Sequence, residues 1–307
     1  MSALTRHRAL SNQMSLEVNF IRDVAARCAA MLDAAGYTNY PAADGDILRT
    51  YTSIRHRRIR PGPRTVHKAP YTVPAHLAAG EQQLLDKVAN GGDLWPHQSR
   101  KIGNVAAEDS MLNDYGIQHF HLGTTPDLKH AGLIEGTKEL LFAVVKEDDF
   151  YSLGIFDHSA WSKQALLDIV QENWPHLLEP FAVEDSPHMK VLGLRHSYTD
   201  EELAVMRKNN INVLQQRTDG TVHMGLGGGI ATDGSSISAT RHAMNLTNHV
   251  KRLQEQVTQE LQTKVADGQI RSDAKVRLDW RTDGPVAVTE PAAFEVDLSK
   301  ALAIPSL

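Results

Sequence analysis

Three histidines and one aspartate in the middle of the chain have the types and spacing that chemistry requires. His119 and His121 are one residue apart in the alternating segment 117–122, and residues at i and i+2 of a strand project from one face. Asp157 and His158 follow a second strand-like segment. If the two segments are neighbouring strands, all four side chains meet at one end of a sheet. Because the chain has 15 histidines, ordinary packed or exposed histidines remain the alternative.

Such a cluster supports two kinds of chemistry. Imidazole titrates near neutral pH, so paired histidines can act as general acid and general base with no cofactor. In the alternative, the histidines at 119, 121 and 158, together with Asp157, hold Zn²⁺ or Mn²⁺ for phosphoester hydrolysis. Sensitivity to a chelator distinguishes the two mechanisms.

The elements that would position these residues are short strands. Segments 139–146 and 150–156 are apolar and of strand length, and the acidic residues 147–149 between them predict a β-hairpin. Apolar residues at helical spacing and a capping box predict helices at about residues 16–35, 81–90, 161–172, 199–208 and 237–265. Segments 276–280 and 285–289 predict a further hairpin.

The order of these elements predicts an α+β fold. It comprises a small antiparallel sheet core with flanking helices and a second, C-terminal α/β part. We expect three parts: a helical region with a basic arm at 1–98, a central β-hairpin core with the histidine cluster at 99–180, and a C-terminal α/β region with the long helix at 181–307.

The central segment also resembles a known family. It has a strand with His119 and His121, a loop with Asp127, an apolar strand, an acidic turn, and a strand that leads to His158. This layout is similar to the catalytic core of RelE/ParE-superfamily toxins, particularly the YafQ-like ribonucleases. The resemblance covers residues 117–161, about 45 of the 307.

The resemblance implies an endoribonuclease that cleaves RNA without a metal ion, by attack of the 2′-hydroxyl on the adjacent phosphate. Carried over by position, His121 and His158 are the acid and base, and His119, Asp127 and Lys138 are supporting groups. It also implies RNA as a partner, together with an inhibitory protein partner. Those toxins are small basic domains, whereas this chain is longer and has a net charge of −5.

A cluster of cations suggests how a mildly acidic chain could hold RNA. The segment 41–74 is rich in Pro, Gly and Arg and predicts an extended arm or a long ordered loop. Its cations, which could bind phosphates, are Arg55, Arg57, Arg58, Arg60, Arg64 and Lys68. The alternative is a basic loop that is solvated or paired with the 37 acidic residues of the chain.

A third reading is a binding or assembly module with no enzymatic activity. The long helix has an apolar stripe between Leu246 and Leu261 that could form a homo-oligomer interface. The glycine-rich segment 225–236 before that helix lacks a Walker A lysine, so it predicts a tight turn capped by Ser235 or Ser236.

Composition places the chain among globular proteins, with 41% hydrophobic and 22% charged residues. No apolar run approaches the roughly 18 residues of a membrane span, so we expect no membrane partner. Residues 1–13 lack the apolar region of a signal peptide, and Cys28 is a single cysteine. These features predict a cytoplasmic protein.

Overall fold

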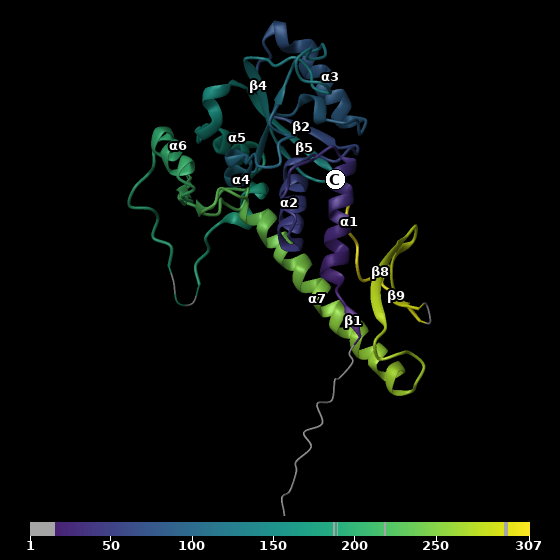
Figure 1. The fold of residues 1–307 in the computed structure, drawn as a ribbon. Helices are drawn as coiled ribbons and strands as arrows, with labels where there is room; N and C mark the ends of the chain where they lie inside the picture. The colour runs from purple at the N-terminus through teal and green to yellow at the C-terminus, as the bar shows by residue number, and fades with distance from the viewer. Residues whose placement is uncertain (1–15, 187, 189, 218, 292–293) are drawn as a thin grey trace, which may run out of the picture. The chain divides into compact units, whose positions relative to one another are not determined.

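The computed structural model describes residues 16–186, 188, 190–217, 219–291 and 294–307. The absence of a signal peptide was predicted from residues 1–13, which lie outside the described residues. Helices and mixed sheets are both present, which confirms the α+β class (Figure 1). None of the helices in these ranges is long and apolar enough to cross a membrane.

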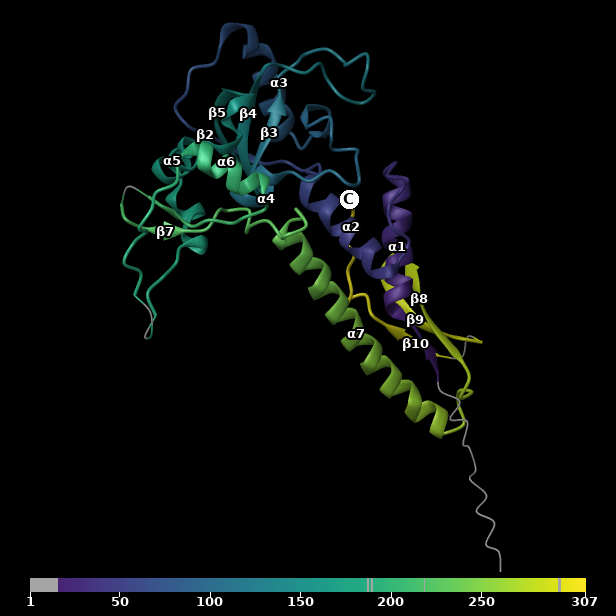
Figure 2. The ribbon, with the colours of Figure 1, turned by 60° about the vertical axis from the view of Figure 1, so that its left-hand side comes forward.

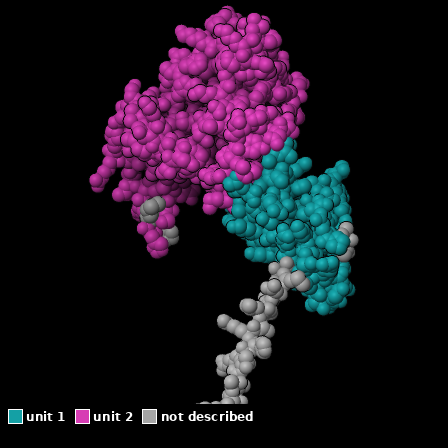
Figure 3. Space-filling model, in the orientation of Figure 1, with its two compact units in different colours: residues 1–31, 43–45, 245–306 teal, residues 32–42, 46–244, 307 magenta. Residues whose placement is uncertain are grey.

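The chain forms two compact units, coloured separately in Figure 3. The terminal unit comprises residues 1–31, 43–45 and 245–306, and the central unit comprises 32–42, 46–244 and 307. This division differs from the predicted boundaries after residues 98 and 180. The central unit combines residues from all three predicted parts. β2 (Thr65–Lys68) of the first part pairs in parallel with β5 (Asp149–Asp157) of the second, and Arg207 of the third part donates to Asp114 of the second at 2.7 Å.

A four-stranded sheet organises the central unit, with strand order β2-β5-β4-β3. β3 (Ile117–His121) pairs antiparallel with β4 (Glu139–Val145), and β4 pairs antiparallel with β5. The predicted hairpin of β4 and β5 is therefore present (Figures 1 and 2). β3 lies at an edge of this sheet, so side chains near its border are open to neighbouring loops.

Both faces of the central sheet are covered. On one face, Leu140 and Phe142 of β4 pack in a cluster with Leu166 and Val170 of α5 (Ala165–Asn173). On the other face, the buried side chains of Phe120, Leu122, Leu141, Ala143 and Phe150 pack with Leu84 and Val88 of α3 (Ala78–Ala89). A strand buried on both faces reads as a continuous apolar run, which is the pattern of ELLFAVV in β4.

The prediction of an extended arm over residues 41–74 is wrong in its first half. Residues Asp44–Arg57 form helix α2, and only the following part is extended. Ile47, Leu48, Tyr51 and Ile54 are buried at helical spacing, and they fix this segment as a helix despite its basic residues.

The other elements of the central unit are short: η1 (Ala75–Leu77), η2 (Trp95–His97), α4 (Ser110–Tyr115), η3 (His158–Ser162), η4 (Pro175–Leu177), η5 (Glu179–Phe181), α6 (Asp200–Lys208), β6 (Gln215–Gln216) and β7 (Val222–His223). The capping box at the start of α6 is confirmed: Thr199 Oγ1 accepts from Glu202 N–H, and the Glu202 carboxylate accepts from Thr199 N–H.

The terminal unit contains most of α1 (Phe20–Ala34) and of α7 (Ile237–Ala266) and the sheet β1-β8-β9-β10. Its strands are β1 (Glu17–Val18), β8 (Lys275–Arg281), β9 (Gly284–Glu290) and β10 (Glu295–Asp297), and β8 with β9 is the predicted C-terminal hairpin. Phe20 N–H at the start of α1 donates to Gln254 Oε1 of α7 at 2.9 Å.

The apolar stripe of α7 is covered within the chain. Val250, Leu253, Val257 and Leu261 are all buried, as is Cys28 of α1. An assembly module that uses this stripe as its interface would require these side chains to be accessible. A homo-oligomer would therefore need another surface.

The glycine-rich segment is shaped by close packing against α4. A Cβ atom at Gly225 would lie 2.0 Å from Asp114 O, and one at Gly227 would lie 2.2 Å from Leu112 O. Glycine is the residue type that permits such an approach of two backbones. Close backbone packing thus explains why glycine occupies these positions, and no bound anion is needed to explain it.

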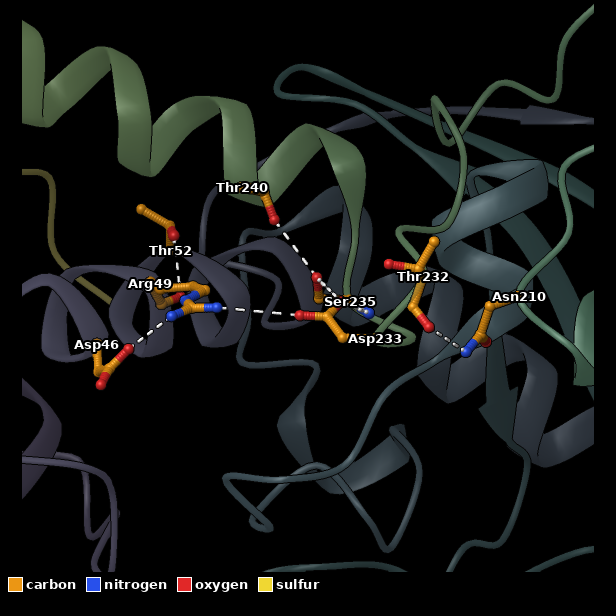
Figure 4. Close-up of polar contacts among 8 residues, drawn as sticks. All are labelled: Asp46, Arg49, Thr52, Asn210, Thr232, Asp233, Ser235 and Thr240. Atoms are coloured by element: carbon orange, nitrogen blue, oxygen red, sulfur yellow. Dashed lines mark hydrogen bonds and ion pairs between the residues drawn. The ribbon is translucent and has the colours of Figure 1, made fainter.

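The end of this segment is held by polar contacts shown in Figure 4. Asp233 accepts from the backbone N–H of Ser235 at 3.0 Å and from its hydroxyl at 2.6 Å. Arg49 of α2 lies 3.9 Å from the same aspartate. Ser236 Oγ accepts from Ala239 N–H, so the expected serine cap of α7 is Ser236.

We expect substitution of two helical glycines by alanine to change the free energy of unfolding in opposite directions. A Cβ at Gly80 of α3 would lie 1.8 Å from Leu122 O, whereas one at Gly45 of α2 meets no described atom within 4 Å. Gly80→Ala should lower the free energy of unfolding by about 1–3 kcal/mol through overpacking. Gly45→Ala should raise it by up to about 1 kcal/mol. Urea unfolding of both variants checks this, and equal effects would contradict the packing of α3 on β3.

Candidate active site

The three central histidines meet at the end of β3 and β5. The ring centroids of His119 and His121 are 6.3 Å apart, and those of His121 and His158 are also 6.3 Å apart. Strand register explains this, because His121 lies opposite Leu140, which lies opposite Phe156, two residues before His158. The expected convergence of the two strand ends is thus present.

These histidines line a cavity of about 470 Å³, all of whose lining residues belong to the central unit. A cavity of this size is in the range of small-molecule and cofactor sites. The lining residues are Arg57, Gln98, Ser99, Arg100, Lys101, Ile102, Ala107, Glu108, Asp109, Ser110, Leu112, Gln118, His119, His121, His158 and Trp161. Trp161 of η3 packs edge-to-face on His119, with ring centroids 4.4 Å apart.

Backbone contacts fix different tautomers for His121 and His158. Thr137 N–H donates to Nδ1 of His121 at 3.2 Å, so the proton of the neutral His121 ring is on Nε2. Nδ1 of His158 lies 2.8 Å from the carbonyl oxygen of Lys138, which can only accept, so this Nδ1 carries a proton. The neutral rings therefore present an N–H donor at His121 and a lone pair at His158.

A further histidine supports the end of β3 from the other side. His97 of η2 is buried, and its Nδ1 lies 3.0 Å from the carbonyl oxygen of His121. Its Nε2 lies 3.1 Å from Nζ of Lys87. With Nδ1–H donating and Nε2 accepting, the ring is neutral, which agrees with a pKa that burial lowers. His97 thus anchors the backbone of His121.

Burial determines the charge of the two inner histidines. It lowers the pKa of His119 and of His121 to about 4. Proximity to His158 adds to this effect at both rings, and Arg100 adds to it at His121. Both rings are therefore neutral at pH 7. His119 is 7% exposed, and its Nδ1 has no hydrogen-bond partner among the described residues.

Arg100 is one of three Arg and Lys residues that line the cavity, and a carboxylate and a glycine hold it in place. Its Nη2 donates to Oδ2 of Asp127 at 2.7 Å, and His130 Nδ1 lies 3.2 Å from the same oxygen. The hydrogen bond from Arg100 is the largest cause of a lowered pKa at Asp127. A Cβ at Gly136 would lie 2.3 Å from Nη1 of Arg100, so the guanidinium packs directly on this glycine.

Three of the six predicted catalytic residues, Asp127, Asp157 and Lys138, lie outside the cavity lining. Asp127 contacts the site through Arg100. Asp157 caps η3 by accepting from the N–H of Ser159, and the hydrogen bonds from the Ser159 hydroxyl and from this N–H lower the pKa of Asp157. Lys138 contributes its carbonyl oxygen to His158. The structure therefore brings together His119, His121 and His158 in the cavity lining. Asp127, Asp157 and Lys138 lie next to this cluster.

Of the six predicted phosphate-binding cations, Arg57 alone lines this cavity. Its guanidinium is buried and donates to the carbonyl oxygens of Asn104 and Val105 at 3.1 and 3.3 Å. Arg55 is on the same helix, α2. Arg55 and Arg57 are therefore helical residues and are not part of an extended arm.

The remaining four cations have separate contacts. Arg58 lies over the ring of Trp95, Arg60 lies 3.5 Å from Glu147, and Arg64 donates to the carbonyl oxygens of Gly62, Arg60 and Lys146. Lys68 is paired with Glu81 at 2.7 Å. Arg60 and Lys68 are thus paired with acidic residues, as in the alternative that the sequence left open, whereas Arg58 and Arg64 contact a ring and backbone carbonyls.

Sequence reasoning missed much of the cavity wall. Gln98, Arg100, Glu108 and Asp109 come from segment 98–110, which has no apolar periodicity to reveal its path. Gln118 offered a signal, because a buried amide within β3 interrupts an otherwise apolar and histidine-bearing strand. Trp161 falls within the predicted helix 161–172, and that apolar pattern gives no sign of a cavity.

The alternative reading of the histidine cluster is a metal site. Within the described ranges, no group of three or more His, Cys, Asp or Glu side chains is arranged to hold a metal ion. The Zn²⁺ or Mn²⁺ alternative therefore stays a prediction for a chelator experiment to test.

Comparison with protein-family models, curated protein sequences and solved structures gives no match for this chain. The resemblance to RelE/ParE-superfamily toxins is therefore neither supported nor opposed.

We expect acid to destabilise the protein through the buried histidines. The unfolded rings titrate near pH 6.5 and the folded rings of His119 and His121 near 4, so only the unfolded chain binds protons in this window. The free energy of unfolding should fall as the pH drops from about 6.5 to about 4, by up to roughly 3 kcal/mol for each ring.

Urea unfolding at pH 7.5, 5.5 and 4.5 measures this slope. His119→Gln should make the slope shallower, whereas His76→Gln, at a side chain that is 65% exposed, should leave it unchanged. A slope that is the same in all three proteins would show that His119 does not titrate as its burial requires.

Proposed function

We propose that the cavity is the active site of an endoribonuclease that cleaves RNA by acid–base chemistry without a bound metal ion. The observation that carries this proposal is the pair of tautomers at His121 and His158. One ring presents a donor and the other an acceptor to the same cavity, with centroids 6.3 Å apart. Attack by an internal hydroxyl on phosphorus needs one group of each kind.

The proposed reaction assigns one proton transfer to each ring. Nε2 of His158 takes the proton of the ribose 2′-hydroxyl, and the 2′-oxygen forms a bond to the adjacent phosphorus. His121 takes up a second proton, at Nδ1, from solvent as the phosphate binds. The bond from phosphorus to the 5′-oxygen breaks, and the His121 imidazolium gives this oxygen its Nε2 proton and becomes neutral. The products are a 2′,3′-cyclic phosphate and a 5′-hydroxyl, and exchange with water returns both rings to their starting state.

His121 requires substrate to become an effective acid. Its pKa of about 4 leaves it neutral in the free protein at pH 7. A phosphate anion in the cavity favours the imidazolium form and raises this pKa. Because the imidazolium also carries a proton on Nδ1, Thr137 N–H gives up its hydrogen bond to that nitrogen in this state. Arg100 and Lys101 line the same cavity and stabilise the negative charge that develops on the phosphate oxygens.

The chemistry favours RNA over DNA as substrate, because DNA lacks the 2′-hydroxyl that serves as nucleophile. We include a cytoplasmic location in the proposal, supported by the single, buried Cys28. An inhibitory protein partner, as in toxin-like systems, and a homo-oligomer stay predictions from the sequence.

We expect His121→Ala and His158→Ala each to lower the rate of RNA cleavage by about 10²-fold or more, the scale for losing a general acid or base. The measurement is cleavage of total RNA by the purified chain, with and without EDTA and with and without ribosomes. Activity that survives EDTA and yields 2′,3′-cyclic phosphate ends is the expected result.

The matched control is His196→Ala, since His196 lies 3.0 Å from Glu202 and outside the cavity lining. Its cleavage rate should stay within threefold of the parent protein. Loss of cleavage on adding EDTA would replace this mechanism by a metal-dependent one. Equal rates for His121→Ala and the parent would remove His121 from the reaction.

A further inference from the structure

The cavity wall near Gln98 has polar groups that the acid–base mechanism does not use. Gln98 is 5% exposed, and its Oε1 accepts no hydrogen bond from the residues that the structure describes. Its Nε2 donates to the carbonyl oxygen of Arg57 at 3.0 Å and approaches Gln118 Oε1 at 3.4 Å. An unpaired buried acceptor typically costs about 1–3 kcal/mol, so this wall is suited to a ligand that donates to it.

Glu108 gives the same wall a charge that phosphate would avoid. Its Oε2 accepts from Asn113 Nδ2 at 3.3 Å, and the residue lines the cavity and is exposed to solvent. A carboxylate repels phosphate but accepts two adjacent N–H groups well. The positive charges of Arg100 and Lys101, which line the same cavity, attract a phosphate, whereas the charge of Glu108 repels it.

We propose that Gln98, Gln118 and Glu108 form a nucleobase subsite that selects guanine. Guanine alone among the four RNA bases has two neighbouring N–H donors, N1–H and N2–H, beside an acceptor, O6, on its pairing edge. The Glu108 carboxylate and Gln98 Oε1 accept from the N–H groups, and the NH₂ group of Gln118 donates to O6. Trp161 in the same cavity provides a ring for stacking.

This inference takes the nature of its ligand from the proposed ribonuclease, but it is tested by binding alone. The probes are the 3′-monophosphates of guanosine, adenosine, cytidine and uridine, with inorganic phosphate as a fifth. Affinity is measured by calorimetry on the full chain carrying His158→Ala. These nucleotides have no bond from phosphorus to a 5′-oxygen, so the measurement reports binding alone. Guanosine 3′-monophosphate should bind at least tenfold more tightly than the other four probes.

Glu108→Gln in the same background tests the assigned residue. It should weaken binding of the guanosine nucleotide by about tenfold or more and change the adenosine nucleotide by less than twofold. Glu147→Gln, at an exposed carboxylate outside the cavity lining, is the matched control and should change neither. Equal affinity for the four nucleotides, or an equal loss for all in Glu108→Gln, would overturn the subsite.

The two proposals fail separately. Guanine selectivity without RNA cleavage would leave the subsite intact and remove the ribonuclease. Cleavage without any preference among the nucleotides would do the reverse. Binding of inorganic phosphate as tightly as the guanosine nucleotide would also overturn the subsite, because the base would then contribute nothing.

Discussion

The antiparallel register of β3, β4 and β5 is the constraint on which the candidate site depends. His121 lies opposite Leu140 and Leu140 opposite Phe156, which brings the chain after β5 beside the end of β3. A slip of one residue would turn every side chain of β3 to the other face. The register is held by two buried clusters, one on each face of the sheet. The apolar core therefore determines which polar groups line the cavity.

The same core explains the electrostatics of the site. Rings placed at the border of a packed sheet lose solvent, and desolvation favours the neutral form of imidazole. Backbone groups of the β3–β4 loop then decide which nitrogen carries the proton, through Thr137 N–H at His121 and the Lys138 carbonyl at His158. Thr137 and Lys138 thus act on the two rings through backbone groups alone. Substitutions that change the backbone path of this loop should affect the site as much as loss of a ring.

The sequence predicts some of this arrangement and not the rest, for physical reasons. Alternation in IQHFHL and the apolar run ELLFAVV predict β3 and β4 because these strands follow simple periodicity. Helix α2 is not predicted, because its arginines interrupt the apolar pattern of four buried residues at helical spacing. The cavity wall from residues 98–110 has no periodic pattern, and tertiary contacts alone decide its path. Arg100 is an example, since its position depends on Asp127 and Gly136, which are distant in sequence.

The central claim is that His121 and His158 are held in complementary tautomers. Two-dimensional NMR that correlates ring nitrogens with ring protons in ¹⁵N-labelled protein measures this directly, with His121→Gln and His158→Gln variants to assign the signals. At pH 8 the account predicts a protonated Nε2 at His121 and a protonated Nδ1 at His158. The same tautomer at both rings, or the reverse assignment, would contradict it.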